Sequence, residues 1–189
     1  SGFLPDAFLN FLAFLGWNPG DERELFTLDE LVEAFSVERI GKSGTKFDIA
    51  KAKWYNEQYL RARPNSELVA FLIAGAEAED LDVPREKIED ILNLVKGRVT
   101  FPADLWRDSK FMISAPSEFD QDVAAKKWSA DAARLLNNYA AALAGFEETF
   151  DAAAVKSLLE SAAERENIKL GKVMQAVRWA VTGTGGGPD

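Results

Sequence analysis

The chain contains neither cysteine nor histidine among its 189 residues. The lack of cysteine excludes a disulfide framework, and the lack of both residues removes the usual zinc ligands and the most common general base. No apolar run approaches the roughly 20 residues of a membrane-spanning helix. No run of Val, Ile or Thr alternates with the period of two that marks a half-buried strand. The sequence therefore predicts a helical protein, and it argues against metal or nucleophile chemistry within this chain.

The start of the chain also lacks the pattern of a secretory signal, which has a basic segment, an apolar segment and a small-residue cleavage site. This absence, with the absence of cysteine, favours a soluble cytoplasmic protein that makes no contact with a membrane. A chain of 189 residues can bury about 70% of its unfolded surface and can hold one large or two modest domains.

Positive charge is scarce overall, because the formal net charge is −9. An acidic chain is a poor candidate for nucleic-acid binding, since Lys and Arg contacts to phosphate supply much of the affinity. Acidic residues concentrate in residues 77–90 and 147–166, where they are typical of solvated helix faces. Between residues 38 and 63, however, Lys and Arg outnumber Asp and Glu. One face of the protein can therefore still be positive.

The first third of the chain predicts three helices. Residues 6–15 are apolar on nearly every side, which is typical of a buried helix, and Gly16 follows as an expected left-handed stop. Thr27 and Glu30 form a capping box at the start of a second helix. Its expected apolar face is Leu28, Leu31, Val32 and Phe35. Asp48 opens a third helix, whose expected stripe is Ile49, Ala52, Asn56, Tyr59 and Leu60.

Further helices are expected over residues 67–78, 84–96, 122–128, 129–144, 151–166 and 170–182. Pro64 disfavours continuation of the third helix, and Asn65-Ser66 offers a new N-cap before residue 67. A second break falls at residues 115–117, which contain a proline. These breaks predict three parts, residues 1–63, 64–115 and 116–189, in an all-α fold.

Residues 2–7, 10–17, 26–31 and 47–56 carry four sequence blocks, which read GFLPDA, NFLAFLGW, FTLDEL and FDIAKAKWYN. In this order they resemble bacterial-type glutamyl-tRNA synthetases, in the segment that follows the catalytic lysine loop. Near the end, KLGKVMQAVR over residues 169–178 resembles the Lys-Leu-Gly-x-x-x-Gln-Pro-Leu/Val-Arg pattern of the same family. Ala176 stands where the family usually has proline.

The resemblance implies a multi-helix, cage-like anticodon-binding domain preceded by a helical region that contacts the tRNA stem. The family is a class I aminoacyl-tRNA ligase that joins glutamate to its tRNA in translation, with ATP and Mg as cofactors. Its ATP-binding signature lies upstream, so we expect a fragment, cut short at both ends, that is inactive alone and holds no cofactor or metal. The expected partners are tRNA(Glu) and the N-terminal catalytic domain of the same chain, and a monomer is expected.

Three residues are expected at the anticodon. The resemblance aligns Arg98 with an arginine that inspects the third anticodon nucleotide and separates glutamate tRNA from glutamine tRNA. The planar fork of donors in arginine suits bidentate contact with a base edge. The resemblance also places Arg178 and Leu170 at the anticodon pocket. The alternatives are an interaction of Arg98 with a helix dipole and a solvated position for Arg178 at the edge of a core stripe.

Five further residues are expected to contact the tRNA backbone or stem: Lys42, Lys46, Lys53, Trp54 and Arg61. The stretch from Gly41 to Ser43 lacks the upstream glycine and strand of a phosphate-binding loop, so we interpret it as a basic surface loop. Trp54 beside an arginine can stack on RNA, or it can pack against a neighbouring helix. The competing hypothesis for the whole chain is a helical protein-interaction module whose acidic faces bind basic partners.

Overall fold

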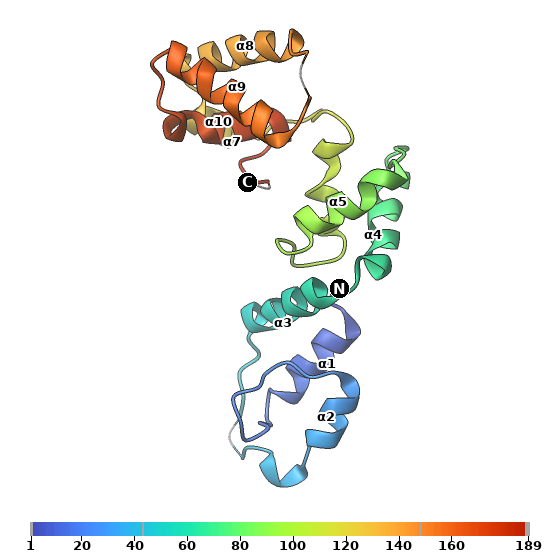
Figure 1. Ribbon diagram of the computed structural model, residues 1–189. Helices are drawn as coiled ribbons and strands as arrows, with labels where there is room; N and C mark the ends of the chain where they lie inside the picture. Colours follow the sequence, from blue (N-terminus) through green and yellow to red (C-terminus); the bar gives the residue numbers. More distant parts are fainter. Residues whose placement is uncertain (1, 43, 148, 188–189) are drawn as a thin grey trace. The chain divides into compact units, whose positions relative to one another are not determined.

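The computed structural model describes residues 2–42, 44–147 and 149–187. The chain forms two compact units, Ser1–Lys110 and Phe111–Asp189. Within the described residues, extended pairing is limited to one isolated antiparallel bridge between Trp17 and Ile40, and everything else that is regular is helical (Figure 1). The all-α prediction is confirmed. None of the described helices is long and apolar enough to cross a membrane.

The first unit is built from six α-helices and a short 3₁₀ turn over its described residues. They are α1 (Pro5–Ala13), α2 (Leu28–Ala34), η1 (Val37–Arg39), α3 (Ile49–Ala62), α4 (Asn65–Glu77), α5 (Arg85–Val95) and α6 (Asp104–Arg107). A second 3₁₀ turn, η2 (Lys110–Met112), stands where the two units meet in sequence. Helix α1 packs against α3 and α2, and α4 packs against α5 and α6.

The helix starts of the first unit follow the local sequence signals. The Thr27 hydroxyl accepts a hydrogen bond from the backbone N–H of Glu30 at 3.3 Å, and the Glu30 carboxylate accepts one from the N–H of Thr27 at 2.7 Å. The Asp48 carboxylate accepts from the N–H groups of Ala50 and Lys51 at 2.8 and 3.3 Å. Both predicted caps are confirmed, because each depends only on residues within one helical turn.

The predicted burial of the first two helices is wrong in part. On α2 only Leu31 is buried, whereas Leu28, Val32 and Phe35 are 55%, 70% and 44% exposed. The reason is that α2 has seven residues and packs on one side only. Leu31 is therefore its one residue buried in the cluster of Trp17 and Phe26, while Ala34 and the partly exposed Phe35 pack at the edge of that cluster. Leu9 and Leu12 leave a similar exposed edge on α1.

Two other local expectations also fail. Helix α1 ends at Ala13, and Gly16 does not adopt the left-handed conformation, which the unit uses at Gly2 and Gly20. Helix α4 begins at Asn65 itself, with Pro64 as its N-cap residue and no side-chain cap, and the buried Asn65 amide donates hydrogen bonds to Glu89 at 2.7 Å and to Asn93 at 2.8 Å on α5. The predicted cap is therefore wrong, and the Asn65 side chain joins α4 to α5 instead.

The second unit contains four α-helices over its described residues: α7 (Gln121–Lys127), α8 (Ala130–Ala144), α9 (Ala152–Arg165) and α10 (Leu170–Thr182). Its core consists of small and aliphatic side chains from the last three helices: Ala132, Leu135, Leu159, Ala162, Ala163, Val173, Ala176 and Val177. Side chains of Asp120, Ser129 and Asp151 cap the first three helices, and Gly183 ends α10 with a positive φ of 76°. Helix α10 packs against both α7 and α8.

Candidate nucleic-acid interface

The turn that follows α5 presents Arg98 to solvent. The helix ends at Val95, and the backbone N–H of Arg98 donates to the carbonyl of Val95 at 2.9 Å. Val95 and Val99 are both buried, whereas the side chain of Arg98 between them is exposed. The buried side chains of Val95 and Val99 therefore hold the turn on the core, and Arg98 lies between them at an exposed position.

Helix α3 and its C-cap residue Arg63 restrain the same turn through polar contacts at Lys96, Gly97 and Thr100. Arg61 Nη2 donates to the carbonyl of Gly97 at 3.0 Å, and Lys96 Nζ donates to the carbonyl of Arg63 at 3.2 Å. The buried amide of Asn56 donates to the carbonyl of Thr100. These bonds join residues 33 to 44 positions apart in sequence, so the backbone on both sides of Arg98 is attached to α3.

Asn56 links this turn to the beginning of the chain as well. Its Oδ1 atom accepts a hydrogen bond from the N–H of Leu4 at 2.7 Å. The hydroxyl of Thr100 in turn donates to the Glu57 carboxylate at 2.7 Å. The spacing of α3 predicts that Asn56 lies in its buried stripe, but it does not indicate these contacts. A polar residue among apolar neighbours on such a stripe is the signal that it satisfies buried backbone groups.

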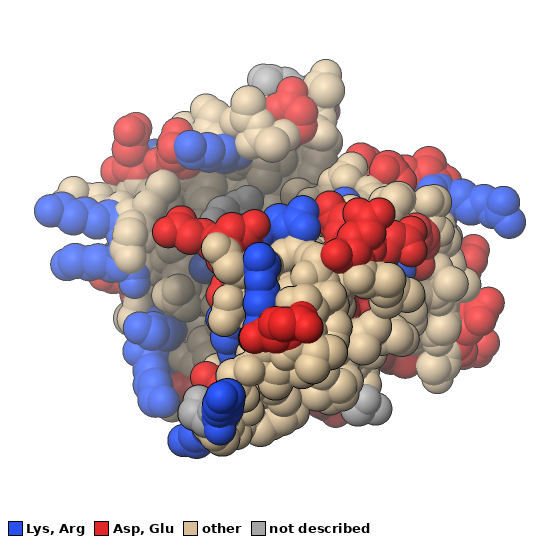
Figure 2. Space-filling model, turned by 90° about the horizontal axis from the view of Figure 1, so that it is seen from below, with Lys and Arg blue, Asp and Glu red and all other residues tan. Residues whose placement is uncertain are grey.

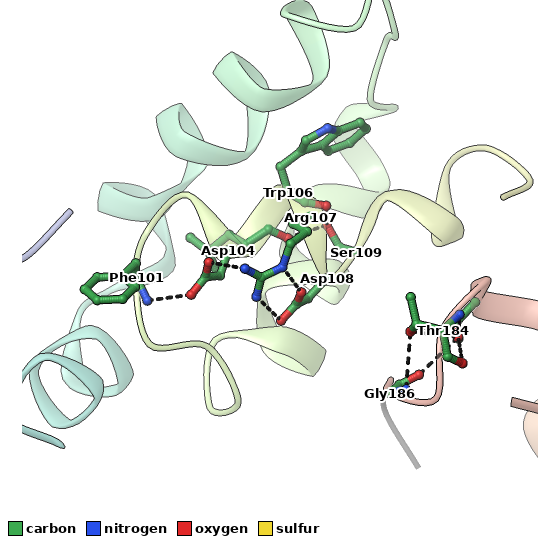
Figure 3. Close-up of polar contacts among 10 residues, drawn as sticks. Phe101, Asp104, Trp106, Arg107, Asp108, Ser109, Thr184 and Gly186 are labelled. Atoms are coloured by element: carbon green, nitrogen blue, oxygen red, sulfur yellow. Dashed lines mark hydrogen bonds and ion pairs between the residues drawn. The ribbon is translucent and has the colours of Figure 1, made fainter. Parts of the chain in front are cut away.

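In the segment after the turn, residues 101–108, the acidic side chains form hydrogen bonds and ion pairs with neighbours in the same segment (Figure 3). Asp104 accepts a hydrogen bond from the N–H of Phe101 at 2.9 Å. Its second oxygen pairs with Arg107 at 2.6 Å, and Arg107 Nε pairs with Asp108 at 2.7 Å. The charge of Arg107 is therefore matched by two neighbouring carboxylates, unlike a side chain held ready for phosphate.

The exposed face of α3 carries an aromatic residue and cations. Trp54 is 36% exposed and packs edge-to-face on the buried Tyr55, with ring centroids 5.0 Å apart. Arg61 lies seven residues further on, so it shares this face about 10 Å along the helix axis. Lys53 is exposed beside Trp54. Trp54 thus packs on its own helix and leaves part of its ring accessible to solvent.

The basic loop before α3 is only partly described. Ser43, which belongs to the Gly41-Lys42-Ser43 stretch, lies outside the described residues. The backbone N–H of Gly41 donates to the carbonyl of Gly16 at 2.6 Å, and Lys42 and Lys46 are exposed. Neither lysine forms an ion pair with another described residue, in contrast to Lys51, which pairs with Glu24 at 2.6 Å.

Charge of both signs appears on the face shown in Figure 2, where Asp and Glu side chains lie beside Lys and Arg side chains. Part of the positive excess counted between residues 38 and 63 is neutralised locally. Arg63 contacts Asp6 at 2.7 Å and Glu67 at 2.6 Å. The cations that remain available to a polyanion on this stretch are therefore fewer than the sequence count suggests.

The structure places Leu170 and Arg178 on α10 of the second unit. Leu170 is half-buried and packs against the core cluster of that unit. Arg178 is half-buried, and its carbonyl accepts a hydrogen bond from the Thr182 hydroxyl at 2.9 Å. Ala176, at the position where the family usually has proline, is 1% exposed and belongs to the core. The helix continues through it without a break.

No described group of three or more acidic side chains is arranged as a metal site. The carboxyl pKa values that shift do so downward. The backbone and hydroxyl of Thr27 lower the pKa of Glu30, and hydrogen bonds from Lys110 and Trp106 lower the pKa of Glu79. These carboxylates are ionised acceptors in structural contacts, which does not suit a proton donor near neutral pH.

Comparison with known proteins gives one consistent family. A model of the anticodon binding domain family matches residues 58–189. The glutamate–tRNA ligases of Cytophaga hutchinsonii and Bacteroides thetaiotaomicron are 50% and 36% identical over 188 residues, and these matches cover 100% of this chain. The chain spans only 36% and 37% of the length of those two relatives.

A solved structure agrees with the sequence relatives. The crystal structure of a glutamate tRNA ligase from Elizabethkingia meningosepticum superposes with a TM-score of 0.82 at 34% identity, and the match covers 100% of this chain and 37% of that one. The resemblance to glutamyl-tRNA synthetases inferred from the sequence blocks is thereby confirmed. Because the family model matches well over half of the chain, this protein belongs to the anticodon binding domain family.

Proposed function

We propose that this chain is the tRNA-binding, anticodon-recognising part of a glutamate–tRNA ligase. The observation that carries the proposal is the exposed Arg98 on a turn that α3 holds by hydrogen bonds from Arg61 and Asn56. The family match over residues 58–189 includes this turn, and the similar proteins are named glutamate–tRNA ligases.

Arg98 is the proposed reader of the third anticodon base. An arginine presents two parallel N–H donors in a plane, so it can bond the acceptor edge of an unstacked base. The backbone of a base-recognising residue must also be restrained, because a mobile backbone would allow its side chain to form hydrogen bonds with an incorrect base as well. The hydrogen bonds of Arg61 to Gly97 and of Lys96 to Arg63 supply this restraint at the backbone, and Arg98 itself is exposed.

The remaining candidates divide between the two units. In the second unit, we propose that Arg178 and Leu170 frame the anticodon pocket, as the resemblance implies. In the first unit, Lys42, Lys46 and Lys53 would contact phosphate, and Trp54 with Arg61 would contact the ribose or bases of the stem. The exposure of these three lysines and of Trp54 supports this assignment.

Ligation itself would belong to the rest of the ligase. We propose that ATP and Mg bind in the catalytic domain of the same polypeptide, and that this chain alone performs no ligation. The proposed partners are tRNA(Glu) and that domain, in a cytoplasmic monomer.

Equilibrium binding to three RNAs tests the proposal: tRNA(Glu), the same tRNA with its third anticodon base changed, and an unrelated tRNA. We expect tRNA(Glu) to bind most tightly, with affinity that falls as salt rises. The variant Arg98→Gln should lose about 1–3 kcal/mol of the preference for the correct third base. Arg85→Gln provides the matched control, because Arg85 is exposed at the opposite end of α5.

Each alternative has its own outcome in this experiment. Equal binding of all three RNAs at every salt concentration would contradict anticodon recognition. Retention of the third-base preference in Arg98→Gln would remove Arg98 from the reader position. A complete lack of RNA binding at low salt would favour the protein-interaction module instead.

A further inference from the structure

Three large aromatic side chains gather on the surface of the second unit. Phe119 lies before α7, Trp128 ends it, and Trp179 lies on α10. The ring centroid of Trp179 is 5.0 Å from that of Phe119 and 5.3 Å from that of Trp128. Phe119 is 36% exposed and Trp128 is 44% exposed. The group, here called the aromatic platform, stands apart from the buried core of the unit.

The platform is held in place by backbone contacts rather than by burial. Trp179 Nε1 donates to the carbonyl of Asp120 at 2.8 Å, and the N–H of Asp120 donates to the carbonyl of Gly183 at 2.8 Å. The Asp120 carboxylate caps α7 by accepting from the N–H groups of Asp122 and Val123 at 2.9 and 3.0 Å. Asp120, the residue between Phe119 and α7, is thus held through its backbone N–H, its carbonyl and its carboxylate.

Gly183 makes this attachment possible. It adopts a φ of 76°, and a Cβ atom there would lie 2.5 Å from the carbonyl oxygen of Glu118 and 2.9 Å from Cβ of Pro116. The chain beyond it is ordered by hydroxyl contacts, in which the N–H of Thr184 donates to Thr182 at 3.1 Å and that of Gly186 donates to Thr184 at 3.2 Å (Figure 3). The rings are therefore orientated before any partner arrives.

Exposed lysines lie on the same two helices as the platform. Lys126 and Lys127 form the last turn of α7, directly before Trp128. On α10, Lys172 lies seven residues before Trp179 and is exposed, so it shares the face of that ring two turns away. The exposed carboxylates of Glu118 and Asp122 flank Phe119 instead. A ligand with an aromatic group and a negative charge would therefore place its charge beside the lysines.

We propose that the aromatic platform stacks an unstacked nucleobase of single-stranded RNA, with its phosphate near Lys126 and Lys127. Nucleobases offer a flat π-face next to a phosphate, which matches exposed rings next to ammonium groups. The proposal rests on the proposed function, and the platform lies within the segment matched by the anticodon binding domain family. It adds Trp128, Trp179 and Phe119 to the RNA-contacting residues, none of which the sequence pattern indicated.

The decisive variants change Trp128 in the full 189-residue chain, with tRNA(Glu) as the probe. Trp128→Leu keeps an apolar side chain but removes the π-face, and we expect it to weaken binding about 10-fold. Trp128→Phe keeps a ring and should retain most of the affinity. Phe150→Leu is the matched control, because Phe150 is 74% exposed elsewhere in the same unit and should change nothing.

A measurement on the unmodified chain guards against a variant that fails to fold. With fluorotryptophan incorporated, the ¹⁹F resonances of Trp128 and Trp179 should move when tRNA(Glu) is added. That of Trp17, which is 4% exposed in the first unit, should stay in place. Trp128→Phe and Trp179→Phe assign the signals.

The outcomes separate the two proposals. If the unmodified chain binds tRNA(Glu), but Trp128→Leu binds equally well and the two resonances do not move, the stacking site is overturned and the proposed function stands. If Trp128→Leu and Phe150→Leu weaken binding equally, the effect is not stacking, and the site is again overturned. If the unmodified chain binds no tRNA at low salt, the proposed function fails and the stacking site fails with it.

Discussion

Arg61 donates a hydrogen bond from Nη2 to the carbonyl oxygen of Gly97 at 3.0 Å, one residue before Arg98. Sequence alone suggested that Arg61 contacts tRNA directly. The structure shows that its guanidinium already restrains the turn that presents Arg98. Arg61 is therefore a candidate positioning residue as well as a candidate contact, and the two roles predict different binding behaviour.

For Arg61→Met, we expect the preference for the correct third anticodon base to fall by about 1 kcal/mol, because a freed Gly97 carbonyl loosens the turn. The measurement is the ratio of affinities for tRNA(Glu) and for its third-base variant. If Arg61 acts only by contacting an RNA phosphate, the affinities for both tRNAs would instead fall together. The slope of log affinity against log salt concentration would then decrease by about 1. Arg61→Lys should restore part of the preference if the bond to Gly97 is what matters.

For Asn56→Ala, we expect a loss of about 2–4 kcal/mol in the free energy of unfolding of the first unit. The substitution leaves the N–H of Leu4 and the carbonyl of Thr100 without their partner, and an unsatisfied buried polar group costs about 1–3 kcal/mol. Urea denaturation followed by circular dichroism measures the loss. Gln58→Ala, on the same helix at a half-buried position, is the control. A loss no larger than that of the control would show that the Asn56 amide is replaceable.

Gly75 marks the closest approach of α4 to α6. A Cβ atom on it would lie 2.3 Å from Cβ and 2.4 Å from Cγ of Trp106. We expect Gly75→Ala to destabilise the first unit by about 1–3 kcal/mol, because both contacts lie near the backbone and cannot be relieved by side-chain rotation. The measurement is again urea denaturation.

The matched control is Gly171→Ala on α10, where a Cβ atom would meet nothing within 4 Å. This change should be neutral or stabilise by up to about 1 kcal/mol, because alanine is the better helix former. If both glycine variants behaved alike, close packing between α4 and α6 would not be the cause.

The lowered pKa of Glu30 predicts that the stability of the fold depends on pH. This pKa lies below the ordinary value of 4.5, because the backbone N–H and hydroxyl of Thr27 bond the Glu30 carboxylate, and Arg23 lies nearby. A lowered folded-state pKa means that the carboxylate stabilises the fold above pH 4.5, and that this contribution is lost as the pH falls through the folded-state pKa.

The free energy of unfolding of the natural chain should therefore exceed that of Glu30→Gln at neutral pH, and the difference should shrink below pH 4.5. Urea denaturation across this range measures both. Asp29→Asn removes the neighbouring acidic charge in the first turn of α2 and controls for the helix dipole. A difference that does not change with pH would show that charge plays no part in the Thr27–Glu30 contact.

The sequence by itself determined the helical class, the family and most helix ends. Thr27 with Glu30, Asp48, Ser129 and Asp151 cap helices in the structure because a cap is satisfied by N–H groups two or three residues away. The four sequence blocks that indicate the family are likewise runs of consecutive residues, so they are recognised without the tertiary structure. The three-part division of the chain and the RNA roles of Arg98, Arg178 and Leu170 stay predictions.

Only the tertiary structure decided which faces are covered and which distant residues meet. Val32 is apolar and sits on the predicted face, yet no described element covers it, because α2 packs on one side only. The Asn65 amide donates to Glu89 on α5 rather than capping its own helix, and Trp179 donates to the carbonyl of Asp120, 59 residues away. Such contacts depend on how helices are placed in space, so the local spacing of residue types does not predict them. A helix cap is predictable because all of its hydrogen bonds lie within a single turn.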